Sequence, residues 1–336
     1  MTQPPSRPAS SSGAVTFSDA AAPEEPPPAA KLPAGRGSRH VRSAPVGTFQ
    51  RRAWTGFLFA LPAMVAVAGI MLLPLFQAAY YSLTTWDGIT STYIGFSAYT
   101  QLFFHTVGIG QILENNAWVV ISIPVGLAVA MVAAFLTATR AVGWKLFRNV
   151  VFFPVALSWV VIGIVFGAFL AQDGGLNALL RGSGLGHLAH DWLGSPATAL
   201  PALLLTFGWA MFGINTVIFI SGLATIPQEL FDAARVDGAG SLRVLLHIVL
   251  PIMRRFVGLA FVVTLISGFT GIFGLIFVMT SGGPGFSTTT LEFQVYQEAF
   301  SLGNFGTAAA LGMVLFAMMA VLTAVIGVIS GRSSDI

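Results

Sequence analysis

The sequence predicts an all-α, polytopic membrane protein with six transmembrane helices. Hydrophobic residues make up 55% of the chain and charged residues only 9%, whereas soluble domains carry roughly 25% charged residues. Six uncharged runs each exceed the roughly 20 residues that a helix needs to cross the hydrocarbon core. Lipid offers the backbone no hydrogen-bond partners, and the runs lack the alternation of β-barrel strands. They must therefore be helices.

The elements follow in order along the chain. Residues 1–50 are rich in Pro, Ala and Ser and cannot bury enough apolar surface to offset chain entropy, so a disordered tail is expected. No apolar segment lies near Met1, so this tail is not read as a signal peptide. A single transmembrane domain is expected over residues 53–331, with a polar loop at 224–255. The six helices are expected at 55–81, 115–138, 149–171, 199–223, 256–280 and 307–330.

Lys and Arg residues are distributed unequally between the two sides of these helices. Fifteen of the 16 lie in the tail, in the turn after the second helix, in the polar loop or at the C-terminus, and Arg181 alone lies on the other side. By the positive-inside rule, both termini and the polar loop are expected to be cytoplasmic. Basic clusters can also bind nucleic acid, but the one-sided distribution favours topology. The preference for Arg over Lys, with abundant Ala and Gly, indicates a GC-rich bacterial genome. The expected location of this multi-span chain is therefore the bacterial inner (cytoplasmic) membrane.

Several kinds of chemistry are excluded or disfavoured. The chain has no Cys, and neither Lys31 nor Lys145 lies in the G-x-x-x-x-G-K-[ST] pattern of an ATP-binding P-loop. No charged residue lies in a span core, which disfavours a proton- or sodium-coupled carrier. His187 and His190 with Asp191 lack an obvious fourth ligand, so we expect no metal site and no cofactor. No nucleophile-elbow spacing occurs, and no catalytic residue is expected.

The polar loop at 224–255 contains the stretch IPQELFDAARVDGAGSLRVLLHIVLP. Gln228–Val236 has helical composition, with acidic residues in its first turn, where the helix dipole favours negative charge. Gly238 can adopt a positive φ and end this helix. A second helix then begins near Ser241 and runs toward Pro251. The two helices form a compact corner whose apolar residues either pack on the bundle or fill a partner's groove.

This loop resembles the EAA loop of permease subunits of binding-protein-dependent ABC importers, whose pattern is roughly E-A-A-x-x-D-G-A, a short spacer, then I-x-L-P. The motif DAARVDGA and the later IVLP match that pattern position by position. Two residues depart from it: Asp232 stands where the family has Glu, and Leu245 stands where it usually has Phe. Asp keeps the carboxylate and Leu keeps the apolar contact.

Other segments resemble the carbohydrate-uptake branch of this family, namely FLFALPAMV, PLFQAAYYSLTTWDG, IGFSAYTQLF and TSGGPGFSTTTLEFQVYQEAF. The resemblance covers about residues 53–330 and implies the type I ABC importer permease fold. It implies a subunit of an ATP-driven sugar importer that works with a second permease subunit, two P-loop ATPase subunits and an extracellular solute-binding protein. The chain itself would not be an enzyme.

Other cargo remains open at this stage. An importer of glycerol phosphate, polyamine or another small solute fits the same loop, and an integral-membrane enzyme is a further alternative. A phosphorylated substrate would favour cationic residues along its route, and none lies in the spans. The sequence therefore favours a neutral carbohydrate.

Two sets of candidate site residues follow. The resemblance implies that the loop transmits motion from the ATPase, through the coupling residues Glu229, Asp232, Ala233, Ala234, Asp237, Gly238 and Ala239. Asp232 is expected to make the charged contact, Ala233 and Ala234 the apolar contacts, and Gly238 the corner. Polar or aromatic residues inside spans can bind sugar hydroxyls or stack on sugar faces, or can simply pack between helices. The substrate-pathway candidates are Trp159, Trp209, Asn215, Phe269 and Phe273.

Overall fold

A computed structural model describes residues 47–138 and 153–331. The chain divides into two units after Leu61; α1 runs through this boundary, and the helix packing described below belongs to the second unit. Six stretches of the described residues are long and apolar enough to span a membrane: Phe57–Tyr81, Ile109–Thr137, Trp159–Gly182, Pro196–Leu223, Arg254–Met279 and Phe305–Val328. The all-α, six-helix prediction is confirmed. The tail expected at 1–50 lies outside the described residues, except that α1 already begins at Gly47.

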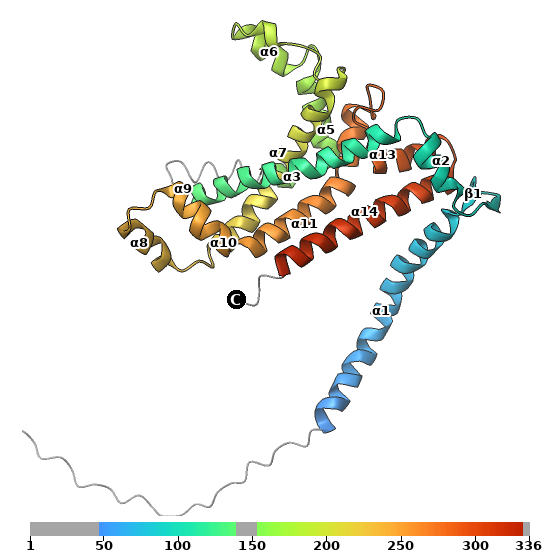
Figure 1. Cartoon of the computed structure of the whole chain (residues 1–336), viewed down its shortest axis with the longest axis horizontal. Coiled ribbons are helices and arrows are strands. Elements are labelled where there is room, and N and C mark those ends of the chain that lie inside the picture. Colours follow the sequence, from blue (N-terminus) through green and yellow to red (C-terminus); the bar gives the residue numbers. More distant parts are fainter. Residues whose placement is uncertain (1–46, 139–152, 332–336) are drawn as a thin grey trace, which may run out of the picture. The chain divides into compact units, whose positions relative to one another are not determined.

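The elements are as follows (Figure 1). The N-terminal part holds α1 (Gly47–Tyr81), β1 (Thr84–Trp86), β2 (Ser91–Tyr93), α2 (Ser97–His105) and α3 (Ile109–Ala138). The middle holds η1 (Phe153–Ala156), α5 (Trp159–Leu170), α6 (Gly175–Gly182), η2 (Gly186–Leu188) and α7 (Pro196–Leu223). The remainder holds α8 (Gln228–Val236), α9 (Ser241–Val244), η3 (Leu245–Val249), α10 (Leu250–Ile252), α11 (Arg254–Thr270), α12 (Ile272–Met279), α13 (Leu291–Tyr296), η4 (Gln297–Ser301) and α14 (Phe305–Gly331).

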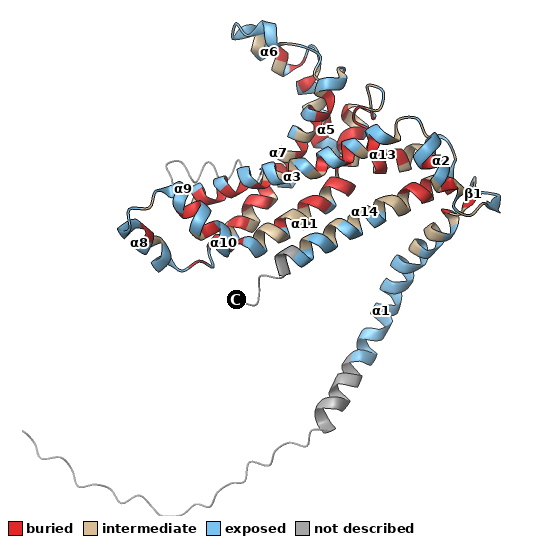
Figure 2. Cartoon of the chain, viewed as in Figure 1, coloured by how far each residue is buried: buried red, intermediate tan, exposed pale blue. Residues whose placement is uncertain are grey.

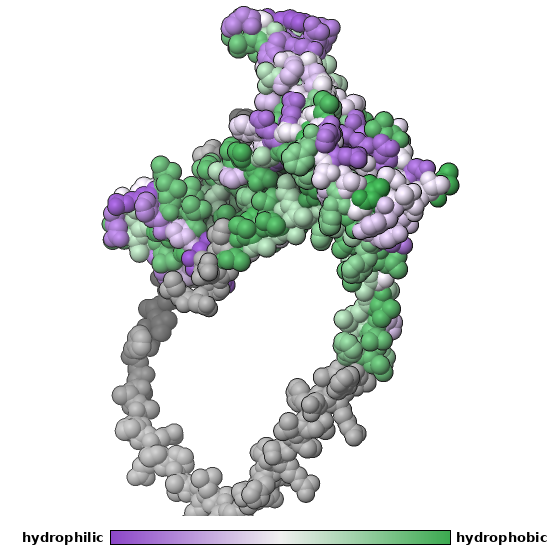
Figure 3. Space-filling view, turned by 45° about the vertical axis from the view of Figure 1, so that its right-hand side comes forward, coloured by the Kyte–Doolittle hydropathy of each residue, from purple (hydrophilic) through white to green (hydrophobic). Residues whose placement is uncertain are grey.

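The core lies between α3, α7 and α11, where buried residues gather (Figure 2). α3 and α7 make the most extensive helix–helix contact of the described residues, and α11 packs on both and on α14. Phe135 near the end of α3 shares a core cluster with Leu223 at the end of α7, so the two helices run in the same direction. Hydrophobic surface separates hydrophilic residues at the α6 end from those at the α8 end (Figure 3). This distribution is that of a multi-pass membrane protein.

Two spans differ from the expected helices: the third begins later, and the fifth is divided. The third span begins with α5 at Trp159, because the Ser158 hydroxyl accepts a hydrogen bond from the Val161 amide at 3.4 Å and caps the helix there. Its expected start at 149–152 lies outside the described residues. The fifth span divides at Gly271 into α11 and α12. A Cβ at Gly271 would lie 2.6 Å from the Trp159 ring, so only glycine lets α5 approach this closely.

A two-stranded hairpin follows α1 and was not expected from the sequence. β1 and β2 pair antiparallel with Thr84 opposite Tyr93 and Trp86 opposite Ser91. The turn contains Asp87 and Gly88, a pairing typical of tight hairpins, and Gly88 has φ +95°. The backbone amides of Thr90 and Ile89 donate to the Asp87 carboxylate and lower its pKa. The Asp-Gly pair between β-formers was the signal that could have predicted it.

Gly306 holds α14 against this hairpin, and its replacement by alanine is expected to destabilise the fold. A Cβ at Gly306 would overlap the Thr84 carbonyl oxygen and lie 2.8 Å from the Trp86 amide nitrogen. Backbone atoms cannot move aside as a flexible side chain can, so we expect a loss of about 1–3 kcal/mol in the free energy of unfolding. Gly312→Ala in the same helix meets nothing within 4 Å and should be neutral or stabilising. Thermal unfolding in mild detergent compares the two; equal stability would contradict the packing.

Candidate functional site

The α8–α9 corner has the shape that the sequence predicts. α8 covers Gln228–Val236, and its end is closed by the Ala239 amide, which donates to the Ala234 carbonyl oxygen at 2.9 Å. Gly238 has φ +69°, a conformation that costs other residues about 1–2 kcal/mol. α9 then begins at Ser241. Glycine therefore makes the corner.

The second arm of the corner continues from α9 through η3 and α10 to Ile252 as one apolar helical stretch. η3 is a π-helical turn in which the Leu250 amide donates to the Leu245 carbonyl oxygen. Pro251 has no amide hydrogen and cannot continue an α-helical ladder, which accounts for a widened turn before it. The expected second helix is present, with a local change of helix type.

The outer surface of the corner is exposed and carries both charge and apolar groups. Glu229, Asp232 and Asp237 are exposed, and the Asp232 carboxylate lies 2.8 Å from Arg235. The apolar side chains of Leu230, Val236 and Leu242 are also exposed, at 40%, 88% and 68%. An apolar surface of this kind, bordered by acids, is typical of a protein-binding site. Ala233 and Gly238 lie on it as well, and Ala239 is half-buried.

The inner surface of the corner packs on the bundle. Ala234 is 5% exposed and belongs to the same core cluster as Phe219 of α7 and Met253. Ala234 thus lies in the core of this chain, and the partner contact expected of the two alanines stays a prediction. Consecutive residues of a helix are turned by about 100° from each other, so only Ala233 faces outward while Ala234 faces the core.

A largely apolar cavity of about 720 Å³ lies between α3 and α7. Two of the five pathway candidates, Trp209 and Asn215, line it. The Asn215 side-chain oxygen accepts a hydrogen bond from the Thr264 hydroxyl at 3.0 Å, which satisfies part of this buried amide and ties α7 to α11. No ionisable side chain is among the described residues that line this cavity.

The other three pathway candidates pack elsewhere. Trp159 stacks on Phe207 with ring centroids 5.8 Å apart and covers Gly271. Phe269 is 2% exposed within the core. Phe273 joins an aromatic group with Phe277, Phe293 and Tyr296. The structure assigns these three side chains to helix packing and does not bring them to the cavity.

A second cavity of about 500 Å³ lies at the first turns of α3 and α7. Gln111, Glu114 and Trp118 of α3 and Ser287 line it, and none of them was among the sequence candidates. Trp118 also lines the first cavity. The polar residues at every third or fourth position of α3 were the signal that could have found this face. The cavity lies at the opposite end of α7 from the α8–α9 corner.

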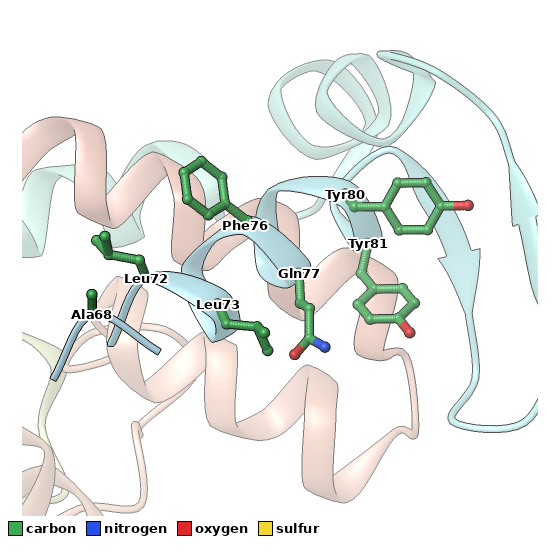
Figure 4. Close-up of a pocket in the computed structure, with 7 residues that line it drawn as sticks. All are labelled: Ala68, Leu72, Leu73, Phe76, Gln77, Tyr80 and Tyr81. Atoms are coloured by element: carbon green, nitrogen blue, oxygen red, sulfur yellow. The ribbon is translucent and has the colours of Figure 1, made fainter. Parts of the chain in front are cut away.

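A third hollow of about 490 Å³ lies on α1 itself (Figure 4). Leu72, Leu73, Phe76 and Tyr80 are among its lining residues, and Gln77 is its polar member. It is a mostly apolar surface of a helix whose apolar window is not buried within the chain. Such a surface suits lipid or a second protein and holds no group for chemistry.

Buried polar residues fasten the segment after α12 to the start of α3. The Asn115 amide donates to the carbonyl oxygens of Phe286 and Thr289 at 2.8 and 2.7 Å. The Asn116 side-chain oxygen accepts from the Leu291 amide at 2.8 Å. Asn115 and Asn116 are 3% and 1% exposed. These side-chain hydrogen bonds satisfy backbone groups of the segment that would otherwise have no partner.

Glu292 sits in the same region, outside the membrane-spanning helices. Both of its carboxylate oxygens are buried, and no described residue completes a hydrogen bond with either, although part of the residue's remaining surface is exposed. Desolvation raises the pKa of Glu292 to about 7, against smaller opposing effects of its own amide and the Thr290 and Asn116 side chains. A buried acid without a charged partner is costly at neutral pH.

Comparison with known proteins decides the family. Residues 122–335 match the family described as binding-protein-dependent transport system inner membrane component. The chain belongs to this family. It is a membrane-spanning permease subunit, a transport component, and the predicted family and fold are confirmed.

Relatives of this permease subunit include several from sugar systems. It is 32% identical over 264 residues to the probable ABC transporter permease protein YurN of Bacillus subtilis, covering 77% of this chain and 90% of that one. It is 30% identical to the diacetylchitobiose uptake system permease protein NgcF of Streptomyces coelicolor, covering 88% and 86%. It is also 30% identical to the multiple sugar-binding transport system permease protein MsmF of Streptococcus mutans, covering 80% and 92%.

Solved structures support the permease fold. A bacterial ABC transporter involved in the import of the acidic polysaccharide alginate matches with a TM-score of 0.72 and 18% identity, covering 86% of this chain and 99% of that one. The same kind of transporter in complex with an alginate pentasaccharide-bound periplasmic protein matches with a TM-score of 0.73, 18% identity and coverage of 86% and 98%. At this identity the likeness concerns the fold alone.

Proposed function

We propose that this permease subunit imports a neutral carbohydrate that an extracellular solute-binding protein delivers. The importer also contains a second permease subunit and is driven by separate P-loop ATPase subunits. The observation that carries the proposal is the exposed α8–α9 corner, which combines acids and uncovered apolar side chains at one end of the bundle. The ATPase subunits bind this corner, and the chain itself hydrolyses no ATP.

The chemistry of the corner supports an ATPase contact. Asp232 lies on the exposed surface of α8 beside Val236, and a carboxylate bordered by apolar groups suits a partner groove with a basic residue. Gly238 fixes the angle between the two arms. The concentration of Lys and Arg in this loop, in the tail and at the C-terminus supports a cytoplasmic location for all three.

Two observations support a neutral carbohydrate as cargo. NgcF and MsmF, both about as similar as any relative above, are named for the uptake of diacetylchitobiose and of multiple sugars. The described lining of the 720 Å³ cavity carries aromatic rings and the Asn215 amide but no cationic side chain. Aromatic faces and amides suit sugar rings and hydroxyls, whereas a phosphate would call for Lys or Arg.

Uptake by the whole importer tests the proposal. The permease subunit, its partner permease, the ATPase subunits and the binding protein are reconstituted in proteoliposomes, and radiolabelled maltose, diacetylchitobiose, glycerol 3-phosphate and spermidine are offered in turn. We expect ATP-dependent accumulation of a neutral saccharide and none without ATP. Accumulation of glycerol 3-phosphate or spermidine alone would overturn the carbohydrate assignment, and uptake that needs no ATPase subunit would overturn the coupling.

A further inference from the structure

The 500 Å³ cavity at the first turns of α3 and α7 is chemically different from the larger one. Glu114 is the one ionisable side chain among the described residues that line it, and no cationic side chain lines it. Glu114 is exposed, and its carboxylate accepts a hydrogen bond from the Trp118 indole nitrogen at 3.4 Å. This pair places a carboxylate beside the indole nitrogen of Trp118, a residue that is 48% exposed.

A buried serine with an unpaired hydroxyl lines the same cavity. Ser287 is 3% exposed and lines the cavity, yet its hydroxyl has no hydrogen-bond partner among the described residues. A buried polar group left unpaired costs about as much as a lost hydrogen bond. A ligand hydroxyl in the cavity would satisfy it. Asn115, which also lines the cavity, holds the backbone on both sides of Ser287 in place through Phe286 and Thr289.

The two cavities are neighbours along one route. Trp118, Pro201 and Leu204 line both, so a ligand leaving the polar cavity passes the indole ring before it reaches Trp209 and Asn215. The polar cavity lies at the end of the bundle opposite to the α8–α9 corner. If the corner is cytoplasmic, this cavity is the first that a substrate from outside would enter.

We propose that Glu114, Trp118 and Ser287 form a carbohydrate-binding site at the entrance of this route, and that Glu114 selects neutral over acidic saccharides; the proposal rests on the sugar-import function above. The indole ring stacks on the apolar face of a sugar, the Glu114 carboxylate accepts hydrogen bonds from two sugar hydroxyls, and the Ser287 hydroxyl binds a third. A carboxylated saccharide would bring a second negative charge against Glu114, with no described cation in the lining to compensate.

The absence of Cys from the chain gives a direct test. Ala197 is exposed and lines the cavity from α7, so Ala197→Cys is a small reporter in an otherwise thiol-free chain. The whole importer carrying this reporter is reconstituted without the binding protein, and its labelling rate by a membrane-impermeant maleimide is measured. The probes are maltose, diacetylchitobiose and a glucuronic acid disaccharide. Ser183→Cys, an exposed position beyond α6 and away from the cavity, is the matched control.

We expect a saccharide that the importer transports to slow labelling of Ala197→Cys and not of Ser183→Cys. In the Ala197→Cys background, Trp118→Ala or Glu114→Gln should raise the saccharide concentration that halves the labelling rate by about ten-fold. This change in affinity corresponds to the loss of one charge-assisted hydrogen bond. Trp118→Phe should retain protection. Glu114→Gln should also let the glucuronic acid disaccharide protect. Unchanged unfolding temperatures show that the variants are folded.

Two outcomes separate this inference from the proposed function. If the importer accumulates a neutral saccharide in proteoliposomes but that saccharide leaves Ala197→Cys labelling unchanged, or protects it equally with Glu114→Gln and Trp118→Ala, the entrance site is overturned while the importer stands. If the importer accumulates none of the saccharides, the proposed function fails in the uptake assay and the entrance site falls with it.

Discussion

Asp232→Arg is expected to weaken binding of the ATPase subunits by at least about 30-fold, because removing one member of a desolvated charge pair typically costs 2–5 kcal/mol. Asp232 lies on the exposed surface of α8, so the added Arg meets the partner and not the core. The lost pair with Arg235 is exposed on both sides and contributes little to stability. The measurement is co-purification of the ATPase subunits in mild detergent, together with substrate-stimulated ATP hydrolysis.

The matched control for this change is Asp173→Arg. Asp173 is also an exposed acid beside an arginine, with its carboxylate 3.8 Å from Arg181, but it lies between α5 and α6, far along the chain from the corner. We expect this variant to keep its ATPase subunits. If Asp232→Arg retains them equally well, or if both variants lose them, the corner is not the specific contact.

Glu292→Gln is expected to stabilise the protein at neutral and alkaline pH. The folded-state pKa of Glu292 is about 7, above the ordinary value of 4.5, so the folded state binds the proton more tightly than the unfolded state does. Below about pH 4.5 both states are protonated and no penalty applies. As pH rises toward 7 the folded state loses stability, by about 3 kcal/mol in full above that pH. Gln carries no charge, so Glu292→Gln removes this loss of stability.

Thermal unfolding between pH 5 and pH 8 measures the effect. At pH 8 Glu292→Gln should unfold roughly 6–12 °C higher than the wild type, from about 2–4 °C per kcal/mol in a domain of this size. At pH 5 the difference should shrink to about 2–3 °C. Asp173→Asn removes an exposed acid and should leave the pH dependence as it is. A Glu292→Gln protein that is less stable than the wild type at pH 8 would show that the carboxylate has an unrecognised partner.

The sequence predicts those parts of the fold that local physics decides. Six apolar runs had no alternative to spanning helices, and Gly238 marked the corner because few other residues tolerate its φ. The inward position of Ala234 was missed because a motif match does not say which face of α8 the bundle covers. The α5 start was missed because the Ser158 cap acts against a continuous apolar run.

Long-range contacts could not be predicted in the same way. Asn115 and Asn116 bond to residues about 175 positions later in the chain, and no local pattern relates these two segments. The burial of Glu292 and the 500 Å³ cavity depend on the contact between these two segments. Of the five pathway candidates, the two that line the cavity lie on α7 and the other three lie on α5, α11 and α12. Which helix lines the cavity follows from tertiary packing and not from residue type.

The inner side of the corner has a mechanical consequence. Ala234, Val244 and Val249 are embedded in one core cluster with the C-terminal ends of α3 and α7, and these helices are packed together toward the opposite end, where Glu114 lies. A force on α8 would therefore act on the C-terminal ends of both helices through this cluster. Under the proposed coupling to an ATPase, the end of the helix pair that lines the 500 Å³ cavity would move together with the corner, because α3 and α7 make the most extensive helix–helix contact of the described residues.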